Sequence, residues 1–321
     1  MVIRSMWSVS GILLAVLSLV AGCATPEAAP PPGSLRLIFI TCAVHQKFFT
    51  PLKKGMHDAA EMMGVECTFT GTPGVDTRVQ AEMVRKAVAD GYDGIALNII
   101  DPAAFDEVIE EAVSQGIPVV AFNVDDHATP NARLSAVCQQ LYQAGVTCGR
   151  HAAAWIPDNS HILMTQHDRG VSALDDRLRG EQDALREKGV RWTVVTTGND
   201  AGKGAEVVAE ALKKNPDIRV VLGTGQSDTE AAGLAIKRHF RGKGYWCAGF
   251  DLSENTLVLI KEGHIRFTID QQPYVQGFYP VVQLTHCIRL GIMPSSVNAG
   301  AGIIDRSNVD RVTELTAKGY R

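Results

Sequence analysis

The chain alternates short apolar runs with longer segments in which apolar residues recur every three to four positions. Short runs of this kind are typical of strands buried on both faces of a parallel sheet, and the longer segments are typical of amphipathic helices. The predicted strands are 35–44, 65–70, 94–98, 119–122, 134–137, 161–166, 191–196, 219–223, 246–250, 265–269 and 301–305. The predicted helices are 50–63, 76–90, 105–115, 139–155, 172–188, 204–215, 229–240 and 275–290. This alternation predicts an α/β protein with parallel sheets wound by right-handed crossovers.

The pattern restarts near residues 157–161, which divides it into two similar units. A chain of 321 residues is also longer than one ordinary hydrophobic core requires. We therefore expect two doubly wound, Rossmann-like lobes. The last predicted elements, from residue 265 onward, return to both units, so a single cut does not separate them.

The segment 117–126, IPVVAFNVDD, ends a buried strand in an amide and two carboxylates. In open parallel sheets, ligands bind beyond the carboxyl ends of the strands. Asn123, Asp125 and Asp126 occupy that position. Such residues also cap turns, so this segment alone leaves a binding cleft and a simple turn equally open.

The N-terminus has the features of an export signal. Arg4 supplies a positive charge, residues 12–20 form an apolar core too short for an ordinary transmembrane helix, and VAGC at residues 20–23 forms a small-residue processing site. This resembles a bacterial lipoprotein signal over residues 1–22, which implies a lipidated Cys23 and a membrane anchor. Residues 23–34 are predicted to form a Pro-rich tether. The alternative is an ordinary secretory signal with an incidental cysteine.

Composition excludes several classes of function. The net charge of −4 gives no reason to expect nucleic acid. Six cysteines remain after Cys23, no CxxC pair is present, and neither a metal nor a cofactor is expected. Export permits disulfides but the spacing gives no pairing, and for Cys42 and Cys247 a free buried thiol is equally reasonable. His161 and His167 are interpreted as ordinary surface and core histidines.

The chain contains a series of loop motifs in this order: HQKFF, DGIALN followed by DP, IPVVAFNVD, SALDDRLRG, GQSD, CAGFD and IDQQPYVQGF. This series resembles the type I periplasmic sugar-binding proteins, the ribose- and galactose-binding group that feeds ABC importers. The order and spacing of the motifs carry the resemblance from about residue 35 to residue 305. It implies an N-terminal lobe of 35–138 plus 272–297 and a C-terminal lobe of 139–271 plus 298–321, with hinge crossings near 138, near 271 and within 294–299.

The resemblance also implies a ligand site between the lobes. Phe48 and Phe49 match the stacking aromatics, and either Asp175 or Arg177 matches a contact at a helix start. The full predicted set is Gln46, Phe48, Phe49, Asn123, Asp125, Asp175, Arg177, Asn199, Ser227, Asp251 and Gln271. These types suit a sugar or polyol, since its hydroxyls both donate and accept while its C–H surface packs on an aromatic face.

Departures from the family bear on the ligand. Ribose binders carry Arg where this chain has Val124 and Asp175, which argues against ribose. Binders of the autoinducer-2 furanosyl ligand carry Lys where this chain has Cys42. Asp125, Asp175 and Asp176 would suit a polyol, an amino-sugar or another cationic ligand.

We therefore expect an exported, lipid-anchored, monomeric receptor that closes on its ligand and presents it to an ABC permease. The alternative is a sensory receptor of the same fold that signals to a membrane kinase or chemoreceptor. An exported α/β enzyme would need a nucleophile or metal constellation that the sequence does not contain.

Overall fold

The computed structural model describes residues 34–125 and 131–321. The predicted signal, Cys23, nearly all of the tether and Asp126 lie outside the described residues. Within those residues, no helix is long and apolar enough to cross a membrane.

The first lobe is built on a six-stranded parallel sheet with the order β11-β5-β4-β3-β1-β2. Its strands are β1 (Arg36–Thr41), β2 (Glu66–Gly71), β3 (Gly94–Leu97), β4 (Val119–Asn123), β5 (Ser135–Cys138) and β11 (Val297–Asn298). Its helices are α1 (Phe49–Met63), α2 (Thr77–Ala89), α3 (Asp106–Ser114) and α9 (Pro273–Leu290), with a 3₁₀ turn at Pro102–Ala104.

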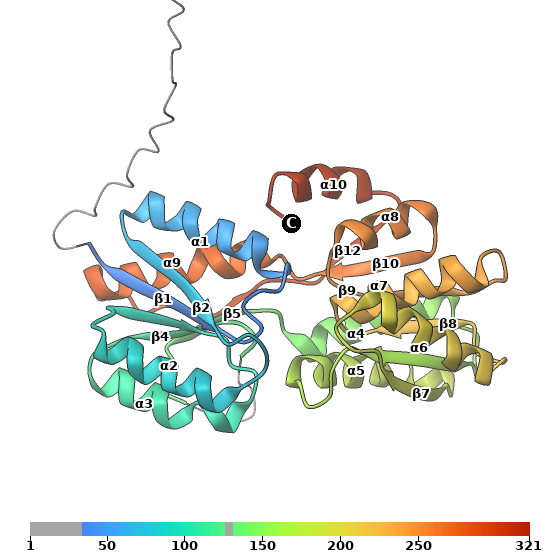
Figure 1. Ribbon diagram of the computed structural model, residues 1–321, viewed down its shortest axis with the longest axis horizontal. Helices are drawn as coiled ribbons and strands as arrows, with labels where there is room; N and C mark the ends of the chain where they lie inside the picture. The colour runs from blue at the N-terminus through green and yellow to red at the C-terminus, as the bar shows by residue number, and fades with distance from the viewer. Residues whose placement is uncertain (1–33, 126–130) are drawn as a thin grey trace, which may run out of the picture. The chain divides into compact units, whose positions relative to one another are not determined.

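Alternate residues of β1 face the two sides of this sheet. Leu37 and Phe39 join the core cluster under α1 and α9, whereas Ile38 and Ile40 join the cluster under α2 and α3. The helices therefore cover both faces, as Figure 1 shows. Burial on both faces explains why the strands are continuously apolar in sequence.

The second lobe is built on another six-stranded sheet with the order β12-β10-β9-β8-β6-β7. Its strands are β6 (His161–Gln166), β7 (Arg191–Thr196), β8 (Val220–Gly223), β9 (Trp246–Phe250), β10 (Ile265–Asp270) and β12 (Gly302–Asp305). Its helices are α4 (Leu141–Ala152), α5 (Ser172–Ala184), α6 (Ala201–Lys214), α7 (Gln226–Ala235), α8 (Glu254–Glu262) and α10 (Val309–Ala317). Short 3₁₀ helices at Ala153–Trp155 and Arg186–Lys188 and a π-helical turn at Ile236–Phe240 extend α4, α5 and α7.

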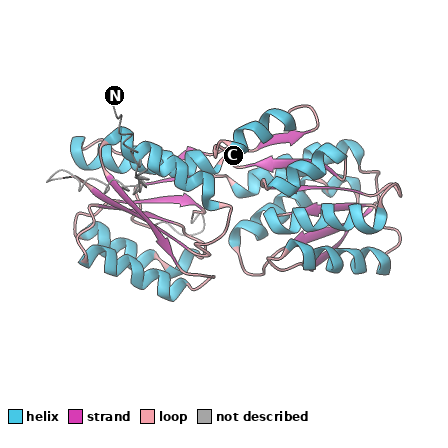
Figure 2. Ribbon diagram, turned by 45° about the horizontal axis from the view of Figure 1, so that its top comes forward, coloured by secondary structure: helices cyan, strands magenta, loops and turns pink. Residues whose placement is uncertain are grey.

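The described chain passes between the sheets after β5, after β10 and between β11 and β12. The two sheets and their helix layers are seen side by side in Figure 2. The two-lobed α/β fold expected from the sequence is confirmed. The exact limits of the lobes stay a prediction.

Several details of the prediction were wrong. Strand β12 pairs with β10 antiparallel, so the second sheet is not purely parallel. Strand β1 ends at Thr41 rather than at residue 44, because Ala43 adopts a left-handed conformation with φ 48°. Helix α6 begins three residues early, at Ala201, because the Asp200 side chain caps it by accepting a bond from the Lys203 N–H. Strand β11 and helices α8 and α10 were not predicted.

All six cysteines of the described residues are free thiols, which is one of the two alternatives left open for Cys42 and Cys247. Cys247 is fully buried and donates to the carbonyl of His264 at 3.4 Å. Among the described residues, no group of His, Cys, Asp and Glu side chains could hold a metal ion.

Candidate ligand-binding cleft

A cavity of about 880 Å³ lies where the carboxyl ends of strands from both sheets meet. Its walls come from the β1–α1 loop and the ends of β3 and β4 on one side. On the other side they come from the loops after β6, β7 and β9 and the start of α7. This is the edge at which open α/β sheets bind ligands, and the volume is that of a small-molecule site.

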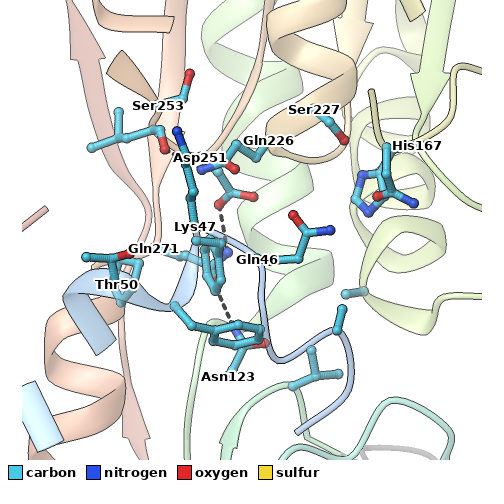
Figure 3. Close-up of a pocket in the computed structure, with 18 of the residues that line it drawn as sticks. Gln46, Lys47, Thr50, Asn123, His167, Gln226, Ser227, Asp251, Ser253 and Gln271 are labelled. Carbon is cyan, nitrogen blue, oxygen red and sulfur yellow. Dashed lines mark hydrogen bonds between the residues drawn. The ribbon is translucent and has the colours of Figure 1, made fainter. Parts of the chain in front are cut away.

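Nine of the eleven predicted site residues line this cavity: Gln46, Phe48, Phe49, Asn123, Arg177, Asn199, Ser227, Asp251 and Gln271. The structure thus brings together residues up to 225 positions apart in the chain. Figure 3 shows Gln46, Asn123, Ser227, Asp251 and Gln271 around the same space.

The first lobe contributes aromatic surface and an amide. The rings of Phe48 and Phe49 meet edge to face with centroids 5.2 Å apart. Phe49 is buried and also contacts Phe69, so it is partly a core residue, whereas Phe48 is more exposed. Phe48 is therefore the better placed of the two to pack against a ligand.

Asn123 ends β4 in a left-handed conformation, with φ 64°. Its Oδ1 accepts a hydrogen bond from Asn98 Nδ2 at 2.9 Å, and its Nδ2 donates to Gln276 Oε1 at 3.0 Å. Nδ2 also lies 3.4 Å from Gln271 Oε1. These bonds fix the orientation of the amide at the cavity floor.

The second lobe contributes a buried charge pair. The Arg177 guanidinium is 3% exposed and stacks on the Phe250 ring at 4.4 Å from its centroid. It donates to Gln139 Oε1 at 2.8 and 3.0 Å and to the Thr224 carbonyl at 2.9 Å. Because a buried cation is costly unless its donors are paired, these contacts are what permit Arg177 at this place.

The Asp251 carboxylate lies beside the Arg177 guanidinium in the lining of the cavity. Its Oδ2 lies 3.4 Å from Arg177 Nη1, and its Oδ1 accepts from Gln271 Nε2 at 2.6 Å. Asp251 follows β9 in a left-handed conformation with φ 69°, which turns the carboxylate toward the cavity. The result is a row of fixed donors and acceptors, Arg177, Asp251, Gln271 and Asn123, that joins both lobes.

Two predicted residues do not line the cavity. Asp125 pairs with Arg133 instead, with Arg133 Nη2 donating to its Oδ2 at 3.0 Å and a second contact from Nε. Asp175 is exposed on α5 and accepts from Gln166 Nε2 at 2.8 Å. Two residues along a helix differ by about 200° in direction, so α5 can present Arg177 or Asp175 to the cavity but not both.

Other cavity residues were not predicted, including Lys47, His167, Gln226 and Glu230. His167 comes directly after β6, so the strand-end rule that singled out Asn123 also applies to it. Cys42 lines the cavity as well, and burial raises the pKa of its thiol to about 11. It is therefore a protonated, weakly reactive group at neutral pH.

Comparison with known proteins identifies the family. Residues 38–289 match the periplasmic binding protein domain family, and this chain belongs to it. The chain is 27% identical over 297 residues to the xylose/arabinose-binding protein XylF of Sulfolobus acidocaldarius, covering 87% of this chain and 73% of that protein. It is 26% identical over 281 residues to the ribose import binding protein RbsB of Bacillus subtilis, covering 84% and 89%.

Among solved structures, the chain resembles a carbohydrate transporter protein of Acidothermus cellulolyticus crystallised with myo-inositol. The two are 30% identical with a TM-score of 0.79, and the match covers 90% of this chain and 100% of that one. These relatives bind substrates and are not enzymes. Membership in the family defines this chain as an extracytoplasmic sugar-binding protein of type I fold.

Proposed function

We propose that this protein captures a monosaccharide or a cyclic polyol in the cleft and delivers it to an ABC transporter. The observation that supports this most is the row formed by Asn123, Gln271, Asp251 and Arg177, which spans both lobes beside the aromatic face of Phe48. A ligand that bonds to this row contacts both lobes at once, so it stabilises their closed arrangement.

Pentoses and inositols are the first candidates. The relatives named above are a xylose/arabinose-binding protein and a protein crystallised with myo-inositol. Ribose is disfavoured, because Val124 and Asp175 stand where ribose binders carry Arg. The sensory alternative has less support, because relatives are named as import or transporter proteins.

A thermal-shift screen tests the proposal. The chain from Ser34 onward is screened against pentoses, hexoses, inositols, linear polyols, amino-sugars and nucleosides. A ligand at a hundred times its Kd adds about 2.7 kcal/mol to the free energy of unfolding, which raises Tm visibly. We expect one pentose or inositol to do so with the parent protein.

Asp251→Asn is the matched control for this screen. Asparagine tolerates the left-handed backbone and can still accept from Gln271, but it removes the negative charge from the cavity. We expect the ligand-induced shift to disappear, and the unliganded Tm should fall as well because the buried Arg177 loses its charge partner. A fall in unliganded Tm with the shift retained would make Asp251 a structural cap, and no shift with any compound would reject a sugar or polyol as the ligand.

We also propose that Cys23 is lipidated and anchors the protein to the membrane, with residues 24–34 as the tether. Multiple buried acyl chains hold a protein firmly at a bilayer. Full-length protein expressed in a bacterial host should fractionate with membranes, and Cys23→Ala should release it. An unchanged membrane fraction for Cys23→Ala would contradict the anchor.

A further inference from the structure

His167 stands out among the cavity residues because another residue holds its ring in place. It follows β6 in the loop before α5, lines the cavity and keeps 23% of its side chain exposed. Its Nδ1 lies 3.0 Å from Asp228 Oδ1. Figure 3 shows His167 and Ser227 on the same side of the cavity.

Asp228 is completely buried and is supported on its other oxygen. Its Oδ2 accepts from the Thr224 N–H at 2.7 Å and from Thr165 Oγ1 at 3.0 Å. The carboxylate therefore accepts from two donors and has one oxygen left for the ring. Because a carboxylate only accepts, Nδ1 of His167 must carry the proton.

The backbone fixes the plane of the ring. A Cβ at Gly225 would lie 2.6 Å from Nδ1 and from Cε1 of His167, so the imidazole packs directly on a glycine that no other residue could replace without displacement. The contact of Nδ1 with Asp228 and the packing of the ring on Gly225 together determine where Nε2 lies. Nε2 has no hydrogen-bond partner within residues 34–125 and 131–321.

We propose that Asp228 and Gly225 hold the His167 ring so that its Nε2 accepts a hydrogen bond from one ligand hydroxyl, which makes His167 a specificity-determining residue. This rests on the proposed function. His167 differs from the row of Asn123, Gln271, Asp251 and Arg177, because the members of that row already bond to one another. A fixed acceptor selects a free hydroxyl and disfavours a hydrogen, fluorine or methoxy group at the same carbon, since none of these donates.

The chain provides a matched control in His161, at the other end of β6. His161 is also bonded to a carboxylate, with Nδ1 at 2.9 Å from Asp217 Oδ2, but its Nε2 is already bonded to Thr193 Oγ1 at 2.8 Å. It does not line the cavity. His161→Leu therefore alters a similar residue without touching the ligand.

The first experiment measures Kd by calorimetry with the ligand found in the screen and with its singly deoxy and singly O-methyl derivatives. For the parent protein we expect one position at which both derivatives bind about tenfold or more weakly. His167→Leu should weaken the unmodified ligand by a similar factor and lose discrimination at that position only, while His161→Leu should match the parent. Equal Kd for the parent and His167→Leu would overturn the inference while leaving the proposed function intact.

The second experiment reads the tautomer without any ligand. In ¹⁵N-histidine-labelled protein, with His167→Leu used for assignment, the parent should show a protonated Nδ1 and an unprotonated Nε2. In Asp228→Asn the amide can donate to Nδ1, so the proton should move to Nε2. A parent protein with its proton on Nε2 would overturn the inference even if His167→Leu weakens binding. Failure of the whole ligand panel would instead count against the proposed function.

Discussion

At the scale of single residues, Glu181 is an acid whose charged form folding disfavours. It lies on α5 and is fully buried; neither carboxylate oxygen has a nitrogen or oxygen partner among the described residues, and the Cys148 thiol contacts it. Cys148, Arg177 and Asp228 face it. Burial raises the pKa of Glu181 well above its usual value; the Cys148 thiol and the Arg177 charge oppose this rise, and Asp228 adds to it.

The sign of the resulting pH dependence follows from linkage. Because the folded-state pKa exceeds that of the unfolded chain, the contribution of Glu181 to stability is fully present below about pH 4 and declines as the pH rises. The decline is at most about 1.4 kcal/mol per pH unit. Glu181→Gln removes this titration. The free energy of unfolding of the variant, relative to that of the parent, should therefore increase steadily from about pH 5 to about pH 8.

Denaturant midpoints at several pH values test this prediction. Glu187→Gln, on the exposed turn after α5, is the control and should follow the parent at every pH. Parallel curves for Glu181→Gln and the parent would mean that Glu181 is ionised in the folded protein. In that case a partner must satisfy its charge.

The sequence predicted which strand ends carry site residues but not which side chains point inward. Asp175 and Arg177 are two residues apart, and only the phase of α5 against the sheet decides between them. Asp125 follows Asn123 by two residues, yet the left-handed turn at Asn123 and the pairing with Arg133 remove it from the cavity. His167 was interpreted as an ordinary histidine because the sequence places no metal-ligand motif around it; its partner, Asp228, is 61 positions away, and nothing local indicates this pairing.

At the scale of elements, both lobes bring two helices together through glycines. A Cβ at Gly277 of α9 would lie 2.0 Å from the Leu52 carbonyl oxygen of α1, and one at Gly55 would lie 2.0 Å from that of Tyr274. In the second lobe, a Cβ at Gly145 of α4 would lie 2.2 Å from the Arg177 carbonyl oxygen. An added Cβ would clash with backbone atoms at each of these glycines, so rotation of a neighbouring side chain cannot relieve the clash.

Gly277→Ala should therefore destabilise the protein although alanine is the better helix former. Helix propensity favours alanine by about 0.5 to 1 kcal/mol, whereas overpacking at a fixed backbone costs typically 1 to 3 kcal/mol or more. The control is Gly202→Ala in the first turn of α6, where the nearest contact is Asp200 Oδ1 at 3.2 Å. Chemical denaturation should show a loss for Gly277→Ala and little change or a gain for Gly202→Ala; equal stability of the two would contradict the close approach.

Three elements of the described chain were not predicted. Helices α8 and α10 have nine residues each, about two and a half turns, so each shows its helical period only briefly. Helix α10 packs on α8 through Val309 and Val312. Strand β11 has two residues and exists because it pairs with β5. The antiparallel direction of β12 follows from the path of the chain, which returns from the first lobe after β11 and runs beside β10 in the opposite direction, rather than from any property of its own residues.

At the scale of the whole molecule, the last residues form a contact between the lobes besides the three connecting segments. Helix α10 belongs with α8 of the second lobe, but the ring of Tyr320 lies 5.3 Å from that of Tyr274 on α9 and 4.9 Å from Lys54 Nζ on α1. Arg321 Nη1 donates to the buried Asp270 Oδ2 at 2.6 Å, beside the second crossing. Burial raises the pKa of Asp270, and the Arg321 charge opposes this shift. Opening of the cleft would separate the Tyr320 contacts.

Tyr320→Ala should therefore shift the unliganded protein toward more open arrangements. The radius of gyration from small-angle scattering should increase without ligand and return to the parent value when the cleft is saturated. Apparent Kd should rise by a factor of a few, because the share of molecules with the cleft closed decreases while the closed site itself is unchanged. Tyr279→Ala is the control, since Tyr279 has the same exposure of 40% on α9 but no such contact with the second lobe. If Tyr320→Ala and Tyr279→Ala have the same radius and the same Kd, the Tyr320 contacts do not govern closure.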